Sequence, residues 1–243
     1  FICAWRPGLF SPRGALDGSL VVDLGYGRVP RTTLELADRL WKLDSSIGVL
    51  GVERDPERVA EAQSSASERL EFRRGDFSLP LRSGERVRMI RAMNVLRQYP
   101  EEAARPAIEQ LVRQLEPGGV LVEGTCHPFG QVMVVGLHGL NEDRQPIHHG
   151  VLFATNFRQG WSPSIFPPVL PKHLIHRMTP GEGIYDFFQH WERAAQVASP
   201  ARSFGIRQHF AATARALAER VDGVELRDRW LRRGWLFWKG APY

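Results

Sequence analysis

The stretch "VVDLGYGRVP" at residues 21–30 decides the fold class. Its apolar run carries an acid, Asp23, and passes into two glycines with the spacing G-x-G, Gly25 and Gly27. A short apolar run with β-branched residues is typical of a buried parallel strand. A glycine turn after such a strand lets a ligand approach the backbone closely, because glycine has no Cβ. The stretch therefore predicts a strand that ends in a ligand-binding turn.

Strand and helix patterns alternate along the first half of the chain. Helical apolar spacing at residues 31–44 follows the opening strand, and Asp55-Pro56-Glu57 is typical of a helix start. Alternation of this kind predicts βαβ units and an α/β fold with a doubly wound, mainly parallel sheet. The strand-like runs are residues 19–25, 47–53, 70–76, 86–96 and 120–126, and a further helix is expected at 100–119.

The alternation ends after His127. Residues 128–183 are rich in Gly, Pro and His and show no clear helix, whereas 184–198 and 203–223 have helical apolar stripes. The chain closes with two strand-like runs around Arg232-Arg233-Gly234, which predict an antiparallel hairpin. We expect seven strands in one domain over residues 1–243, with 128–200 inserted as a cover over the substrate.

Composition indicates a globular protein with an ordinary surface. The 243 residues are 43% hydrophobic and 24% charged, with a net charge of +5. Lysine occurs three times among the 32 basic residues, and the arginines are scattered among acids. A solvated charged surface is therefore favoured over a nucleic-acid face, although Arg73-Arg74 and the run "RDRWLRRG" are denser.

The cysteines and the ends of the chain show no pattern typical of disulfides, metal binding, membrane insertion or secretion. Cys3 and Cys126 provide neither a disulfide framework nor a metal-binding spacing. No apolar stretch is long enough to cross a membrane, and "FICAW" at the start is too short for a signal peptide. We expect no membrane association and a cytoplasmic location. The chain begins at Phe1 and not at methionine, so the natural chain could begin earlier.

The residues after the G-x-G turn argue against a dinucleotide. Arg28, Val29 and Pro30 stand where a dinucleotide site would have its third glycine. Pro30 has no N–H to donate to a phosphate, and Asp23 before the turn would repel one. A ligand with an ammonium group and no phosphate fits better.

Four motifs together resemble the class I S-adenosylmethionine-dependent methyltransferases. They are "VVDLGYG", "GVERD" at residues 51–55, "RRGDF" at 73–77 and "LEPGGVLV" at 115–122. The resemblance covers about residues 18–127 and the closing hairpin, and it implies a Rossmann-like methyltransferase fold with S-adenosyl-L-methionine as cofactor. The missing third glycine departs from the family pattern.

The resemblance also implies roles for particular residues. Asp23, Gly25 and Gly27 would lie along the methionine moiety, and Asn94 would approach it from the end of its strand. The remaining cofactor-binding residues would be Glu53 at the ribose diol, Asp76 at the adenine amino group and Phe77 on the adenine ring. Arg54, next to Glu53 in "GVERD", is also expected to bind the cofactor.

The acceptor is less well defined by sequence than the cofactor. "NVLR" at 94–97 lacks the Asn/Asp-Pro-Pro-aromatic tetrad of exocyclic-amine DNA methyltransferases, so that class is disfavoured. His127 is the first candidate for a general base, and a hydrogen-bonding loop histidine is the alternative. His148-His149 and His173-x-x-His176 lack further partners at ligand spacing, which disfavours a metal site. Tyr185 and Trp191 are candidate lining residues of the acceptor pocket.

The sequence is compatible with three functions. The favoured one is methyl transfer to a small molecule of unknown identity. The alternatives are an RNA methyltransferase that uses Arg73, Arg74 and the hairpin arginines on phosphates, and a non-catalytic module that keeps the cofactor fold. The sequence does not decide the oligomeric state.

Overall fold

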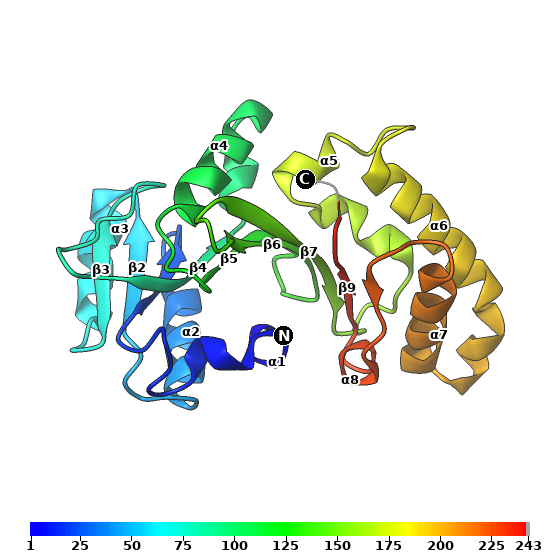
Figure 1. Ribbon diagram of the computed structural model, residues 1–243, viewed down its shortest axis with the longest axis horizontal. Helices are drawn as coiled ribbons and strands as arrows, with labels where there is room; N and C mark the ends of the chain where they lie inside the picture. Colours follow the sequence, from blue (N-terminus) through cyan, green and yellow to red (C-terminus); the bar gives the residue numbers. More distant parts are fainter. Residues whose placement is uncertain (242–243) are drawn as a thin grey trace. The chain divides into compact units, whose positions relative to one another are not determined.

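The computed structural model describes residues 1–241 and divides the chain into two compact units (Figure 1). The first unit comprises Phe1–Val95, Arg105–Glu123 and His138–Ile147. The second comprises Leu96–Ala104, Gly124–Leu137 and the chain from His148 onward. The organisation as one domain with a cover at 128–200 stays a prediction.

The expectation of seven strands is wrong, because the described residues form a nine-stranded sheet. The two additional strands, β6 (Val132–Leu140) and β7 (Pro146–Thr155), lie where the sequence shows no clear helix and predicts no strand. Their runs mix valines with Gly and His, so neither strict alternation nor a pure apolar run marks them. The strand order is β3-β2-β1-β4-β5-β6-β7-β9-β8.

In the first unit, β1 (Leu20–Leu24) pairs in parallel with β2 (Val49–Glu53) and with β4 (Val87–Met93), and β2 pairs with β3 (Leu70–Arg74). The mainly parallel arrangement and these strands are confirmed. The register places Asp23 opposite Gly51 on one side and Arg91 on the other. Parallel strands of a βαβ sheet are buried on both faces, and β2 is buried along its whole length.

Helices connect these strands as the sequence predicts. Helix α2 (Arg31–Trp41) follows the glycine turn and packs against β2, and α3 (Pro56–Ala62) packs against β2 and β3 (Figure 1). Asp55 is the N-cap of α3, and its carboxylate accepts hydrogen bonds from the backbone N–H groups of Glu57 and Arg58. The helix start predicted at Asp55 is therefore confirmed. The remaining elements from α1 to β5 are α1 (Ile2–Trp5), α4 (Glu101–Val112) and β5 (Val120–Cys126).

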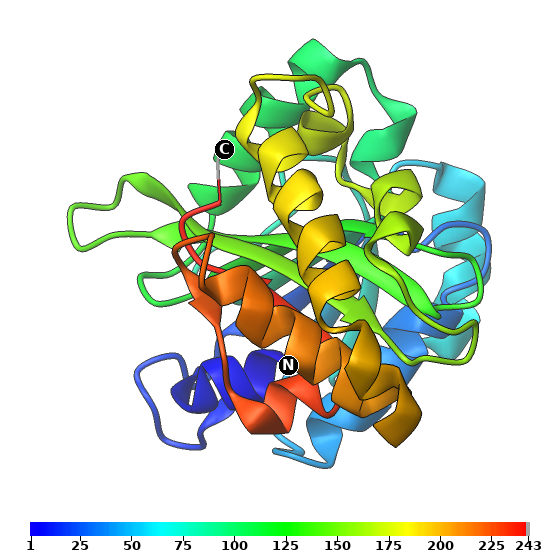
Figure 2. The same cartoon turned by 90° about the vertical axis from the view of Figure 1, so that its right-hand side faces the viewer.

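The second unit contains the antiparallel helix pair α6 (Gly183–Val197) and α7 (Ile206–Ala218), which lie side by side in Figure 2. The short α5 (Lys172–Ile175) precedes them. The apolar stripe of α6 faces an aromatic core, in which Trp191 is completely buried against Phe153 and Phe166. Trp191 is thus a core residue, and the candidate role as an acceptor-lining residue does not fit its burial. Tyr185, the other candidate, is half-buried.

The closing antiparallel pair is confirmed, with one difference. Strand β8 (Val224–Glu225) pairs antiparallel with β9 (Trp235–Trp238), and β9 pairs antiparallel with β7. The connection is not a tight turn, because Asp228–Leu231 forms the short helix α8. Trp230 and Leu231 of this helix are buried, so local packing favours a helical turn. Within residues 1–241, no helix combines the length and apolarity that a membrane crossing requires.

Candidate functional site

The two glycines of the G-x-G turn are held differently. Both have left-handed backbone conformations, with φ of 71° at Gly25 and 80° at Gly27. A Cβ at Gly25 would lie 2.7 Å from Val95 Cγ2, so this glycine is required by packing within the protein. At Gly27, apart from the glycine and its two chain neighbours, no heavy atom of the described residues lies within 4 Å of that position. Only Gly27 therefore offers the backbone to an approaching ligand.

Asp23 is occupied by protein partners. Arg91 Nε donates to Oδ1 and Nη2 donates to Oδ2, each at 2.7 Å, and Thr33 Oγ1 donates to Oδ2 at 2.6 Å. Asp23 is 2% exposed, so the bidentate pair neutralises a buried charge. Arg91 compensates the charge of Asp23, so Asp23 would repel a phosphate less than an unpaired acid would. Contact of Asp23 with a methionine moiety stays a prediction.

Glu53 closes the glycine turn from the end of β2. Its Oε2 accepts the N–H of Gly27 at 3.0 Å, and Oε1 accepts those of Arg54 at 2.9 Å and Asp55 at 3.3 Å. A carboxylate has about four lone-pair sites, so Oε2 retains capacity for a hydroxyl donor. Arg54 contributes its backbone here, and its carbonyl accepts a hydrogen bond from Arg74. The structure thus brings Gly27, Glu53 and Arg54 together.

Tyr26, between the two glycines, is buried beneath the turn. Its ring meets Phe72 edge-on at 5.3 Å between centroids, and its hydroxyl donates to the carbonyl of Arg58 at 3.5 Å. Burial, reinforced by the negative charges of Glu53 and Asp23, raises the pKa of Tyr26 to about 12. The phenol therefore stays neutral at physiological pH, and its role is to support the turn from below.

The segment after β3 carries Asp76 and Phe77. Asp76 is exposed, and its Oδ1 accepts the N–H of Ser78 at 2.8 Å. Gln114 fixes this segment, because its Nε2 donates to the Phe77 carbonyl at 2.7 Å and its Oε1 accepts the N–H of Leu79 at 2.8 Å. The half-buried Phe77 ring and the other oxygen of Asp76 lie at the carboxyl end of β3, where the doubly wound fold binds its ligands.

Asn94 follows β4 in a left-handed conformation, with φ of 61°. Asparagine adopts this region more readily than most residues, yet the conformation still marks a constrained position. Asp23 and Glu53 lie within the last two residues of β1 and β2, as the resemblance implies. Asp76 and Asn94 lie just after β3 and β4 in the same unit.

His127 belongs to the second unit and stabilises a turn there. Its backbone N–H donates to the Val132 carbonyl at 2.8 Å, and its ring Nδ1 accepts the backbone N–H of Phe129 at 3.4 Å. The Phe129 ring lies 5.6 Å from the imidazole. These contacts match a hydrogen-bonding loop histidine, and a catalytic role for His127 stays a prediction.

Two of the arginines proposed to contact RNA, Arg73 and Arg74, have protein partners in the first unit. Arg73 donates to Glu85 at 2.6 Å and to Glu71 at 2.9 Å. Its hydrogen bonds also hold the pKa of Glu85 low, at about 2. Arg74 donates to the carbonyl of Arg54. These contacts disfavour Arg73 in particular as a phosphate ligand.

The histidines and acids of the described chain form no group of three or more with a metal-binding arrangement. His176 Nδ1 lies 3.6 Å from a carboxylate oxygen of Glu101, which is a pair and not a ligand set.

The sequence missed Arg91, Thr33 and Gln114 as supports of the site. Arg91 is the one of the three with a signal in the sequence, since it is a charged residue within the strand-like run at 86–96. Its partner could be named only from the register of two strands that are distant in sequence.

Comparison with known proteins gives structural matches alone. No family model and no curated protein matches the chain. Among solved structures, the magnesium protoporphyrin IX methyltransferase ChlM from Synechocystis with bound SAH is 24% identical, with a TM-score of 0.37 over 52% of this chain and 53% of that one. The methyltransferase CcbJ from Streptomyces caelestis is 18% identical, with a TM-score of 0.35 over 54% of this chain and 64% of that one.

A third match is LepI in complex with SAM, at 17% identity and a TM-score of 0.40. It covers 49% of this chain and 30% of LepI. This chain thus spans less than two thirds of each matched structure. ChlM and CcbJ are named as methyltransferases, and the ChlM and LepI structures hold SAH and SAM, respectively.

Proposed function

We propose that this protein binds S-adenosyl-L-methionine and transfers its methyl group to a small-molecule acceptor. The observation that carries the proposal is the pairing of Gly27 with Glu53: an open backbone position whose N–H is held by a carboxylate 3.0 Å away. This carboxylate can accept hydrogen bonds from a ribose diol, and Pro30, which precedes α2, has no N–H to donate to a pyrophosphate.

The other residues of the first unit fit the same ligand. Phe77 offers an aromatic face for an adenine, and Asp76 retains an oxygen for the exocyclic amino group. Asn94, directly after β4, would approach the methionine portion. The ion pair between Asp23 and Arg91 leaves no uncompensated charge beneath the ligand.

The bound group would supply a sulfonium methyl donor. As the acceptor–methyl bond forms, the sulfur–methyl bond breaks and its electron pair stays on sulfur, which leaves S-adenosylhomocysteine. The protein then has to align the acceptor and exclude water, and a base removes the acceptor's proton where the acceptor carries one. His127 is our proposal for that base.

Calorimetry with S-adenosylhomocysteine tests the cofactor site. Glu53→Gln keeps the shape of the side chain and removes its charge, so we expect the free energy of S-adenosylhomocysteine binding to weaken by about 1–3 kcal/mol. Glu61→Gln, an exposed acid on α3, is the matched control and should bind like the unaltered protein. Equal affinities of the two variants, or NADH binding of similar strength, would contradict the proposal.

Mass spectrometry of extract metabolites incubated with the protein and labelled S-adenosylmethionine tests the transfer itself. A labelled small molecule supports the enzyme. Binding without any labelled product would favour the non-catalytic alternative, and label found in RNA would favour the nucleic-acid alternative.

A further inference from the structure

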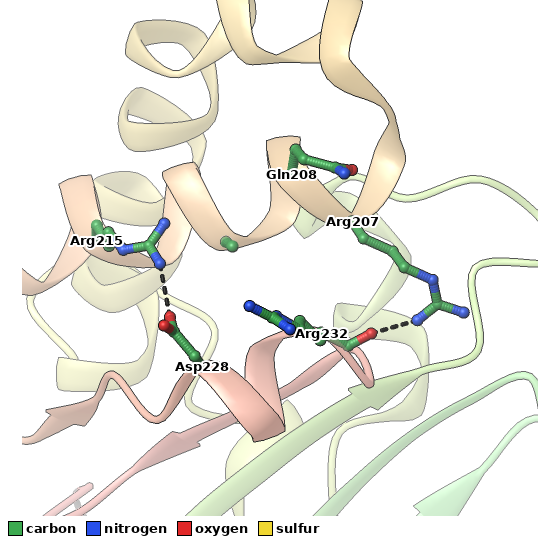
Figure 3. A pocket seen from close by; sticks show the side chains of 6 residues that line it. Arg207, Gln208, Arg215, Asp228 and Arg232 are labelled. Carbon is green, nitrogen blue, oxygen red and sulfur yellow. Dashed lines mark hydrogen bonds and ion pairs between the residues drawn. The ribbon is translucent and has the colours of Figure 1, made fainter.

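A basic hollow lies in the second unit, between α7 and α8 (Figure 3). Its volume is about 460 Å³. Helix α7 contributes side chains from one face, at positions separated by one helical turn, and α8 with its C-cap closes the other side. The lining residues are Arg207, Gln208, Ala211, Arg215, Asp228 and Arg232.

The charges around this hollow do not balance. Arg215 Nη2 lies 2.7 Å from Asp228 Oδ1, so these two side chains neutralise one another (Figure 3). Arg207 and Arg232 remain, and the part of the chain that the structure describes offers neither of them a carboxylate within ion-pair distance. The lining therefore carries a net charge of two positive units.

Arg207 is held in place by contacts that use few of its hydrogen-bond donors. One of its nitrogens donates to the main-chain carbonyl of Arg232, and its guanidinium lies 4.9 Å from the centroid of the Phe157 ring. A guanidinium has five N–H donors, so most of them remain for a ligand. The same hydrogen bond joins α7 to the end of α8, which fixes the two sides of the hollow relative to each other.

The start of α7 adds to the excess of positive charge. Its first turn contains Arg207 and no acid, and its N-cap, Gly205, provides no side-chain acceptor. A cation near a helix N-terminus is unfavourable because the helix dipole is positive there. An anion bound beside Arg207 would remove this repulsion.

We propose that this hollow binds the phosphate group of a small phosphorylated molecule. Arg207 and Arg232 are its ionic ligands, and the Gln208 amide is a further donor. A phosphate monoester carries close to two negative charges at neutral pH and has three acceptor oxygens, which matches two guanidinium groups. The site lies in the second unit and goes beyond the proposed methyl transfer, on which it does not depend.

A phosphate-bearing small molecule fits better than RNA, because Arg207 and Arg232 lie around one hollow and not along an extended track. In the run "RDRWLRRG", Arg227 lies over the Trp230 ring and pairs with Glu225. Arg233 lies over the Trp235 ring, and Arg229 is exposed outside the hollow. A phosphodiester backbone would need a longer track of available cations.

Titration calorimetry with inorganic phosphate at low ionic strength tests this site. We expect Arg232→Gln to weaken phosphate binding at least tenfold. Arg229→Gln is the matched control, because Arg229 is an exposed arginine on the same short helix outside the hollow, and its affinity should stay within twofold.

A second variant keeps the test valid if loss of an arginine disturbs the fold. Asp228→Asn releases Arg215 and should tighten phosphate binding several-fold. Equal affinities of the Arg232 and Arg229 variants, or no gain with Asp228→Asn, would overturn the proposal. Acetate bound as tightly as phosphate, or a single-stranded RNA bound far more tightly than phosphate, would overturn it as well.

Discussion

Replacing Arg91 with methionine tests whether the acid in the glycine-turn strand is a structural ion-pair partner. The change removes both donors that hold the two oxygens of Asp23, and it leaves Thr33 as the remaining side-chain donor. Breaking a buried ion pair costs about 3–5 kcal/mol, because an uncompensated charge stays behind. The Arg91 side chain is 22% exposed, so water reaches it in part and we expect a loss of about 3 kcal/mol.

Urea unfolding of a double-mutant cycle measures this effect. Asp23→Asn in the Arg91→Met background removes the stranded charge, so the double variant should be less destabilised than the sum of the single variants by more than about 1 kcal/mol. Arg39→Met on the exposed side of α2 is the control and should change stability by about 0.5 kcal/mol or less. If the losses of unfolding free energy in Arg91→Met and Asp23→Asn simply added in the double variant, Asp23 and Arg91 would not act as an ion pair. Loss of S-adenosylhomocysteine binding in Asp23→Asn but not in Arg91→Met would show that Asp23 holds the ligand directly.

Three further predictions concern other parts of the chain. Burial raises the pKa of Glu123 from 4.5 to about 8, so the stability that its protonated form provides is complete below about pH 4.5 and is lost as the pH rises towards 8. Between pH 5 and 8, the free energy of unfolding should fall by about 3 kcal/mol more in the unaltered protein than in Glu123→Gln. Urea unfolding of both proteins across this range measures the difference, and equal pH dependence of the two would contradict the prediction. Trp191→Ala should cost about 3–5 kcal/mol in the same assay, against about 0.5 kcal/mol for the exposed Gln189→Ala. Gln114→Ala should accelerate amide hydrogen exchange at residues 77–79 without affecting β1, and unchanged exchange there would remove its assigned role.

Local patterns explain why much of the first unit could be predicted. The runs that became β1, β2 and β5 are short and mainly apolar, and the start of β3 alternates apolar and charged residues, so each indicates a strand without reference to distant parts of the chain. The helix start at Asp55 depends on hydrogen bonds to residues two and three positions further on. Such features are complete within a few residues, and a sequence therefore displays them.

Features that depend on pairing between distant segments could not be predicted in this way. Strand β7 begins with Pro146 and half-buried histidines, and its last residues are buried by partners that include β9, more than 80 residues later. The same holds for Arg91, whose partner is set by a register between β1 and β4. In both cases the residue types are visible in the sequence, but the contact that gives them meaning is long-range.

The glycine turn shows how far a motif can be interpreted. Gly25 and Gly27 are equivalent in the pattern G-x-G, and both adopt φ values that favour glycine. Their surroundings differ, since Val95 occupies the space beside Gly25 whereas the space beside Gly27 is open and its N–H is held by Glu53. An alanine at Gly25 would meet both backbone strain and a clash with Val95, so it should destabilise the fold, whereas an alanine at Gly27 would meet strain alone. If the turn binds a ligand, the Gly27 variant should therefore lose S-adenosylhomocysteine affinity at a smaller cost in stability than the Gly25 variant, and the opposite order would place the ligand elsewhere.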